Sequence, residues 1–172
     1  MKVLTIGDKE YTLEYSFAAA ECKDCVEKVF KMISGSYIGR HGAWGNEQES
    51  KSNMAEALAD GTASMYAELP DTVITAFYAG LKENNAVMNK TAAKDLLKQY
   101  FKENSEIGSF WDMFDLIKKC MEEDGFFKLT GMDKMLEEIN QAAKDAAEKA
   151  SETNQSESKK TTNSKKKSVS TN

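Results

Sequence analysis

The stretch that decides the fold runs from Leu69 to Phe127 and contains LPDTVITAFYAGLKENN (69–85), KTAAKDLLKQYFKEN (90–104) and SFWDMFDLIKKCMEEDGFF (109–127). In each piece the apolar residues recur every three or four positions, which is the spacing of one face of an α-helix. The three apolar stripes are Val73, Ile74, Phe77, Tyr78 and Leu81; Ala93, Leu96, Leu97, Tyr100 and Phe101; and Phe110, Met113, Phe114, Ile117, Cys120 and Met121. Three amphipathic helices in succession must bury their stripes, so we expect the rest of the chain to pack against them.

The first 15 residues have the pattern of two β-strands. Val3–Ile6 and Tyr11–Tyr15 flank Gly7–Glu10, and Gly-Asp between two such runs signals a hairpin turn. An isolated hairpin is only marginally stable in water. We therefore expect it to pack on a helix or to pair its edge with a second copy, which would make a homo-oligomer.

The segment between the hairpin and the central stretch predicts two helices and a loop. Ser16 is suited to cap a helix over Phe17–Ser34. Residues 35–53 contain four glycines and lose the apolar period, which predicts a long loop of a kind that is usually functional or disordered. A weaker helical pattern covers Met54–Leu69, and Pro70 suits the first turn of the helix that follows.

The C-terminal part of the chain loses its apolar residues. A last helical stripe follows Thr130 and decays before residue 150, and 151–172 consist mainly of Ser, Thr, Asn, Gln, Glu and Lys. Such a segment cannot bury enough apolar area to offset its ordering entropy, so it is predicted to be a disordered basic tail. The predicted fold is mainly α: an N-terminal β-hairpin followed by a small helical domain of about five to six helices, ending at residue 150.

Charge and hydropathy argue against several classes of protein. The whole chain has a net charge of −5 although residues 159–172 carry five lysines and no acid, so its body is acidic, which disfavours nucleic-acid binding. No stretch approaches the roughly 20 apolar residues that a membrane span needs. No secretory signal is recognisable, so the three cysteines are expected to be reduced thiols in a cytoplasm.

Cys22 and Cys25 form a C-x-x-C pair, which occurs in redox sites and in zinc sites. A redox pair needs its first cysteine at a helix N-terminus, where the dipole lowers the thiol pKa, but the predicted helix begins about five residues earlier. A zinc site needs four ligands, and neither Cys120 nor His41 stands in a second paired motif. Core packing is therefore the preferred interpretation, with a thiol or metal-binding protein as an alternative.

The other candidate catalytic groups have simpler explanations. His41 is the only histidine and has no nucleophile motif beside it, and the glycines around it lack the G-K-[ST] sequence of a phosphate-binding loop. The acidic clusters at 122–124 and 137–138 have no pattern that would bury them or separate their pKa values. We therefore predict a protein that is not an enzyme and that uses no cofactor or metal.

Aromatic residues supply the candidates for partner contacts. Trp44 lies in the glycine-rich loop, Phe126 and Phe127 follow a glycine, and Tyr78 lies in the central stretch. Aromatic side chains are enriched among the residues that contribute most to binding. The alternative is that these residues fold back to cap the core.

The central stretch resembles the tail assembly chaperones of siphophages, above all those of phages and prophages of Gram-positive hosts. The resemblance rests on a helix carrying FYAGLKENN (77–85), a helix that opens with Thr91-Ala92-Ala93, and a helix that ends in CMEEDG (120–125). With the N-terminal hairpin it covers residues 1–127. The loop over 35–53 and the helix after residue 136 have no counterpart in the family pattern.

The resemblance implies a non-enzymatic function. Such chaperones bind the tape measure protein, keep its long apolar helices from aggregating and help recruit tail tube subunits, in the host cytoplasm and not in the mature virion. Exposed apolar seams between helices would capture amphipathic segments of that partner. The residues by themselves indicate a cytosolic interaction domain, so a helical adaptor or regulator of a bacterial complex unrelated to phage is the alternative.

Overall fold

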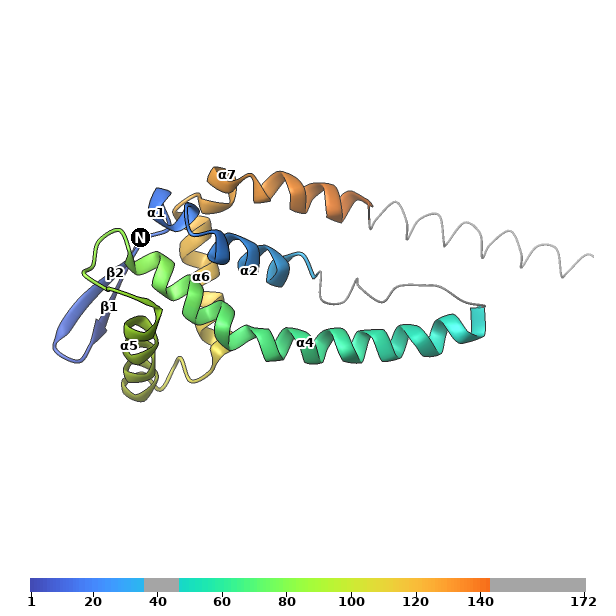
Figure 1. Ribbon diagram of the computed structural model, residues 1–172, viewed down its shortest axis with the longest axis horizontal. Coiled ribbons are helices and arrows are strands. Elements are labelled where there is room, and N and C mark those ends of the chain that lie inside the picture. The colour runs from blue at the N-terminus through green and yellow to red at the C-terminus, as the bar shows by residue number, and fades with distance from the viewer. Residues whose placement is uncertain (36–46, 143–172) are drawn as a thin grey trace, which may run out of the picture. The chain divides into compact units, whose positions relative to one another are not determined.

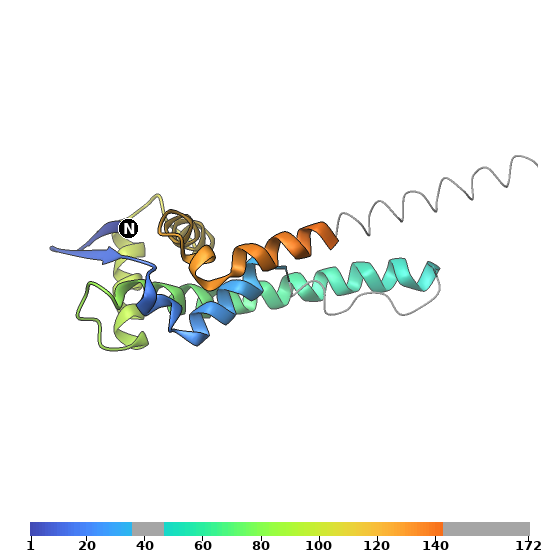
Figure 2. The same ribbon diagram turned by 90° about the horizontal axis from the view of Figure 1, so that it is seen from above.

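The computed structural model describes residues 1–35 and 47–142, in two units: residues 1–133, and the residues from 134 onward (Figures 1 and 2). The fold is mainly α with a two-stranded N-terminal hairpin, which confirms the predicted class. Its elements are β1 (Lys2–Ile6), β2 (Lys9–Leu13), α1 (Phe17–Ala20), α2 (Lys23–Ile33), α4 (Glu47–Leu81), α5 (Lys90–Glu103), α6 (Phe110–Glu123) and α7 (Phe126–Thr130). In the second unit residues 134–142 are helical. The predicted domain end at residue 150 and the predicted tail lie outside the described residues.

The hairpin is tighter than predicted. β1 and β2 pair antiparallel with Ile6 opposite Lys9, so the turn consists of Gly7 and Asp8 alone. Gly7 has a φ of +61°, the left-handed conformation that two-residue hairpin turns need at this position. Leu4 and Leu13 are buried, because the hairpin packs on α4 and α5 as expected.

A side chain closes the outer edge of β2. The Thr12 N–H donates to Asn85 Oδ1 (3.1 Å), and Asn85 Nδ2 donates to the Thr12 carbonyl (2.7 Å). Two residues further along the chain, the Glu14 N–H donates to the carbonyl of Gly80 in α4 (2.9 Å). Asn85 and the last turn of α4 thus occupy both outward-facing backbone groups of Thr12 and the N–H of Glu14, which an added strand would need on this side of the hairpin.

The single helix predicted over Phe17–Ser34 is wrong, because the chain breaks it into α1 and α2. Cys22 lies between them in an extended conformation (φ −77°, ψ 90°). The break allows both Ala19 and Cys25 to be buried. Six residues apart, these two positions would lie about 120° apart around one continuous helix, at roughly 100° per residue, so they would not share one face. The Ser16 side chain makes no capping bond, and its hydroxyl instead donates to Glu83 Oε2 (2.7 Å).

One long helix, α4, replaces two predicted elements and part of the predicted loop. It begins at Glu47 rather than after residue 53 and continues through Pro70 to Leu81. Proline inside a helix cannot donate to the carbonyl four residues earlier and usually breaks the helix. Leu69 and Val73 are both buried on either side of it, so core packing holds the helix together across Pro70.

The C-terminal half of α4 forms the centre of the core, in contact with α1, α2, α5, α6 and β2 (Figure 1). The three predicted stripes face this core, with Tyr78 and the outer residues of α5 and α6 half-buried. Tyr15 is fully buried beside α4 and donates its hydroxyl to the Ala76 carbonyl (3.2 Å). A Cβ atom at Gly80 would lie 2.7 Å from Tyr15 Cζ, so this close approach requires glycine.

Candidate partner-binding surface

The N-terminal half of α4 carries apolar side chains on its surface. Leu58 and Met65 lie in line with the buried Leu69 at spacings of seven and four residues, and Tyr66 lies beside them. Leu58 is 51% exposed and Tyr66 is 55% exposed, whereas Met65 is half-buried. We call Leu58, Met65 and Tyr66 the α4 stripe. It continues the core along the part of α4 that extends beyond α5 and α6 (Figures 1 and 2).

The first turn of α6 extends the α4 stripe with aromatic rings. Trp111 is half-buried, and its ring meets the Tyr66 ring edge to face at a centroid distance of 5.9 Å. It makes a second edge-to-face contact, also at 5.9 Å, with Phe114, which belongs to the core. Such contacts orient rings and add to the free energy gained from burial. A row of aromatic side chains therefore leads from the core to the exposed surface of α4.

A small apolar pocket lies where α4, α5 and α6 meet. Its volume is about 80 Å³, and its lining residues are Ile74, Lys94, Leu97, Lys98, Phe101 and Phe110. Sites for small molecules and cofactors usually span roughly 300–1,000 Å³. The pocket therefore suits the end of a single apolar side chain rather than a small-molecule ligand.

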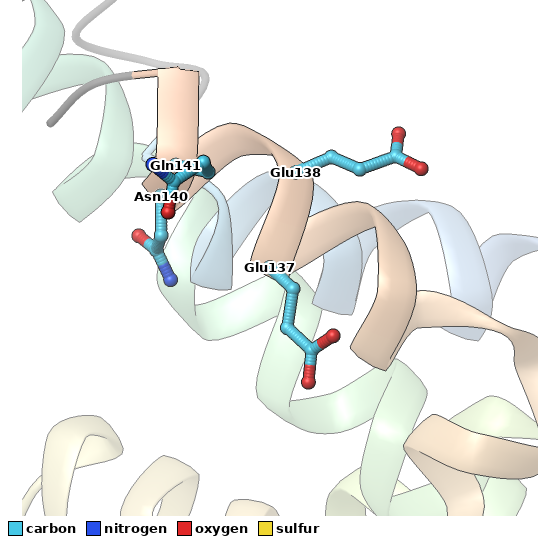
Figure 3. A pocket seen from close by; sticks show the side chains of 4 residues that line it. All are labelled: Glu137, Glu138, Asn140 and Gln141. Atoms are coloured by element: carbon cyan, nitrogen blue, oxygen red, sulfur yellow. The ribbon is translucent and has the colours of Figure 1, made fainter. Parts of the chain in front are cut away.

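Among the described residues, two more open depressions lie away from this pocket. One of about 380 Å³ is bounded by Tyr11 of β2 and by residues of α5 and the loop before it. The other lies in the second unit, where Glu137, Glu138, Asn140 and Gln141 line it (Figure 3). Figure 3 shows the carboxylates of Glu137 and Glu138 pointing in different directions, and both residues are exposed. This arrangement does not bring the two acids together as a catalytic pair.

Asp124, from the other acidic cluster, has a structural role. One carboxylate oxygen accepts a hydrogen bond from the Met1 ammonium, and the other accepts the Tyr15 N–H at 2.9 Å. The hydrogen bond to Asp124 raises the pKa of the Met1 amino group. Glu122 and Glu123 are exposed. The cluster thus contributes one residue that ties the start of the chain to the end of α6.

The structure places the four predicted partner residues differently. Trp44 lies outside the described residues. Phe126 is fully buried and meets the Tyr15 ring edge to face at 5.9 Å, so its side chain belongs to the core. Tyr78 and Phe127 are half-buried, and a partner role for them stays a prediction. None of these described residues belongs to the α4 stripe.

Sequence reasoning missed Tyr66 and Trp111. The sequence does indicate that this segment is helical, because Leu58, Met65 and Leu69 have helical spacing. That pattern predicts a separate weak helix over Met54–Leu69, with Pro70 in the first turn of the next helix. Which face of it the rest of the chain covers depends on tertiary packing, and no local pattern gives that information.

The cysteines occupy two kinds of environment. Cys25 and Cys120 are buried, and Cys22 is half-buried. Burial raises the pKa of the Cys25 thiol to about 12, with a smaller contribution from Cys22. In the described ranges no three His, Cys, Asp or Glu side chains are grouped so as to hold a metal ion, and His41 lies outside them. The expectation that α2 begins well before Cys22 is wrong, because the helix starts directly after it.

The exposed surface of α4 and α6 can thus accept apolar side chains, as an amphipathic helix from a partner would present them.

No helix in the described part of the chain is both long and apolar enough to cross a bilayer. Comparison of the chain with protein-family models, with curated proteins and with solved structures finds no match.

Proposed function

We propose that this chain is a non-enzymatic protein-binding domain that holds amphipathic helices of a partner. The observation that carries the proposal is the α4 stripe, in which Leu58 and Tyr66 keep half of their surface exposed on a helix whose other half forms the core. Apolar side chains gathered on the surface of a folded protein are typical of interaction sites. A partner helix lying along α4 would cover the stripe together with Trp111.

The resemblance over residues 1–127 leads us to propose which partner this is. The chain would be a siphophage tail assembly chaperone, and its client would be the tape measure protein, whose long apolar helices need cover before the tail is built. It would also help recruit tail tube subunits, in the host cytoplasm, and would not remain in the virion. An apolar stripe and a pocket for one side chain suit a client that offers many similar helical segments in turn.

The test is co-expression of the full chain with helical fragments of a tape measure protein. The soluble fraction of each fragment and its co-purification with the chain are measured. We expect the wild-type chain to keep the fragments soluble and to bind them. The proposal fails if the wild-type chain neither binds nor solubilises any of them.

Surface variants locate the binding site. Leu58→Ala combined with Tyr66→Ala should weaken binding of the fragment by tenfold or more, roughly the effect of losing one strong contact residue. Phe17→Ala is the matched control, because Phe17 is 73% exposed but belongs to α1. Equal losses in both variants would remove the α4 stripe from the proposal. If the double variant instead loses a host protein while no tape measure fragment binds, the adaptor alternative is correct.

A further inference from the structure

Two thiols occupy the capping positions at the start of α2. Cys22 is the N-cap residue, and Cys25 is the third residue of the helix. The side chains at these two positions face each other, which is why they can form a capping box. In this same chain Ser109 and Asp112 hold the equivalent positions of α6, and Ser109 Oγ lies 2.6 Å from Asp112 Oδ2. Cys22 and Cys25 thus hold the two positions whose side chains can meet, and Cys22 is close enough to contribute to the raised pKa of the Cys25 thiol.

Cysteine is a poor choice for this position if it only has to cap the helix. Good N-cap residues accept a hydrogen bond from the first turn, as Asn89 does in α5 (2.9 Å from Ala92 N) and Ser109 does in α6 (3.2 Å from Asp112 N). The Cys22 side chain makes no such bond. Helix stability alone therefore does not explain a cysteine at the start of α2.

We propose that Cys22 and Cys25 form a reversible intramolecular disulfide by exchange with an external disulfide oxidant. Residues three apart on a helix have Cα atoms about 5 Å apart, within the range of roughly 4.4–6.8 Å that disulfides adopt. Both thiols are free in this structure. Cys22 is half-buried and can meet an oxidant from solvent, whereas Cys25 is fully buried and can react only after Cys22.

The exchange takes two steps. The Cys22 thiolate attacks one sulfur of a low-molecular-weight disulfide, forms a mixed disulfide with it and releases one thiol. Cys25 then loses its proton to solvent and attacks Cys22 Sγ, which closes the Cys22–Cys25 bond and releases the second thiol. Two cysteine thiols are oxidised, and the oxidant is reduced to two thiols. Because burial keeps Cys25 protonated, the second step is the slow one and accelerates as the pH rises.

The start of α2 differs from the one that the sequence predicts, and the proposed disulfide does not depend on the proposed function. The sequence predicts a helix that begins about five residues before Cys22, and such a helix disfavours a redox pair. The structure instead starts α2 at Lys23. The first cysteine therefore lies where redox-active C-x-x-C pairs have theirs.

The experiment equilibrates the folded, full-length chain in glutathione buffers with an increasing share of glutathione disulfide. Free thiols are then blocked, and the protein is analysed by mass spectrometry. Trypsin cleaves after Lys23, between the two cysteines, so the two peptides stay joined only if the disulfide has formed. We expect these joined peptides, a free Cys120, and complete reversal by dithiothreitol.

Three variants separate the steps. Cys25→Ala should hold one glutathione on Cys22, because nothing remains to displace it. Cys120→Ala should behave like the wild-type chain. If circular dichroism shows that Cys25→Ala does not fold, Cys22→Ala replaces it and should leave Cys25 and Cys120 unmodified in the folded state. A wild-type chain that stops at the mixed disulfide, joins Cys25 to Cys120, or oxidises only when unfolded would overturn the proposal.

Discussion

The two halves of α4 belong to one helix and differ in what surrounds them. The C-terminal half is buried on nearly every side, through Leu69, Thr72, Val73, Ile74, Thr75, Ala76, Phe77, Ala79 and Leu81. The N-terminal half keeps Leu58 and Tyr66 about half exposed. All-round burial is what the central helix of a domain needs, and an apolar face left on the surface is what binding needs. One helix therefore serves as core at one end and presents a surface at the other.

The largest effect should come from truncating the buried half. Phe77→Ala removes a fully buried ring and should lower the free energy of unfolding by about 3–5 kcal/mol. Tyr66→Ala, the matched truncation on the exposed half, should cost about 1 kcal/mol, mainly through its contact with Trp111. Urea denaturation followed by circular dichroism measures both. Equal losses would show that the two halves do not differ as described.

An intermediate effect is expected at the junction between the halves. Pro70→Ala should raise the free energy of unfolding by about 1 kcal/mol, because the new N–H can donate to the Tyr66 carbonyl. The gain is partly offset by the greater freedom of the unfolded chain. Thermal unfolding measures the change. Lower stability in the variant would mean that Pro70 starts a separate helix, as the sequence predicts.

The smallest effect concerns Asp71, which links the junction to two other helices. Its carboxylate pairs with Lys28 of α2 (2.9 Å) and with Lys90 of α5. Partial burial raises the pKa of Asp71, but the hydrogen bonds from Lys90 and Lys28, with the charges of both lysines, lower it by more in total, so the pKa lies below its usual value. The pair therefore stabilises the fold above the ordinary Asp pKa of about 3.9, and this contribution disappears as the pH falls through the lower folded-state value.

Asp71→Asn tests this ion pair. Because the Asp71 side chain is 48% exposed, solvent screening limits the loss to a few tenths of a kcal/mol at pH 7. The difference from the wild-type chain should shrink as the pH falls below about 4, measured by urea unfolding at a series of pH values. Asp95→Asn, which removes an exposed pair with Lys98 on α5 alone, is the control and should change little. A difference that persists at low pH would rule out the ion pair as its cause.

The sequence predicted the features that rest on long, regular patterns. The stripes of α5 and α6 repeat over three to four turns each, so their helices and buried faces follow from periodicity. The hairpin followed from alternation around Gly7-Asp8. The break before α2 could not be predicted in this way. Because α1 has only four residues, its apolar pattern fits a separate short helix as well as it fits the first turn of one long helix.

The features that the sequence predicted wrongly or missed depend on contacts between residues that are distant in the chain. Pro70 obeys a local rule for helix starts, and burial of Leu69 and Val73 overrides it. The exposure of Tyr66 depends on where α6 brings Trp111. The sequence shows the C-x-x-C pair, but the position of Cys22 at a helix start follows from the break between α1 and α2, which only the fold reveals.

The pairing of Asn85 with Thr12 has a consequence for assembly. A sheet that polymerises needs two growing edges, and on the β2 side the Asn85 amide already occupies the backbone groups of Thr12. A strand added on this side would have to break these bonds, so pairing between copies is favoured through β1. If β1 pairs with β1, that edge is used in both copies, and the assembly holds two chains and four strands. One asparagine side chain thus protects part of the β2 edge against strand-by-strand growth into fibrils.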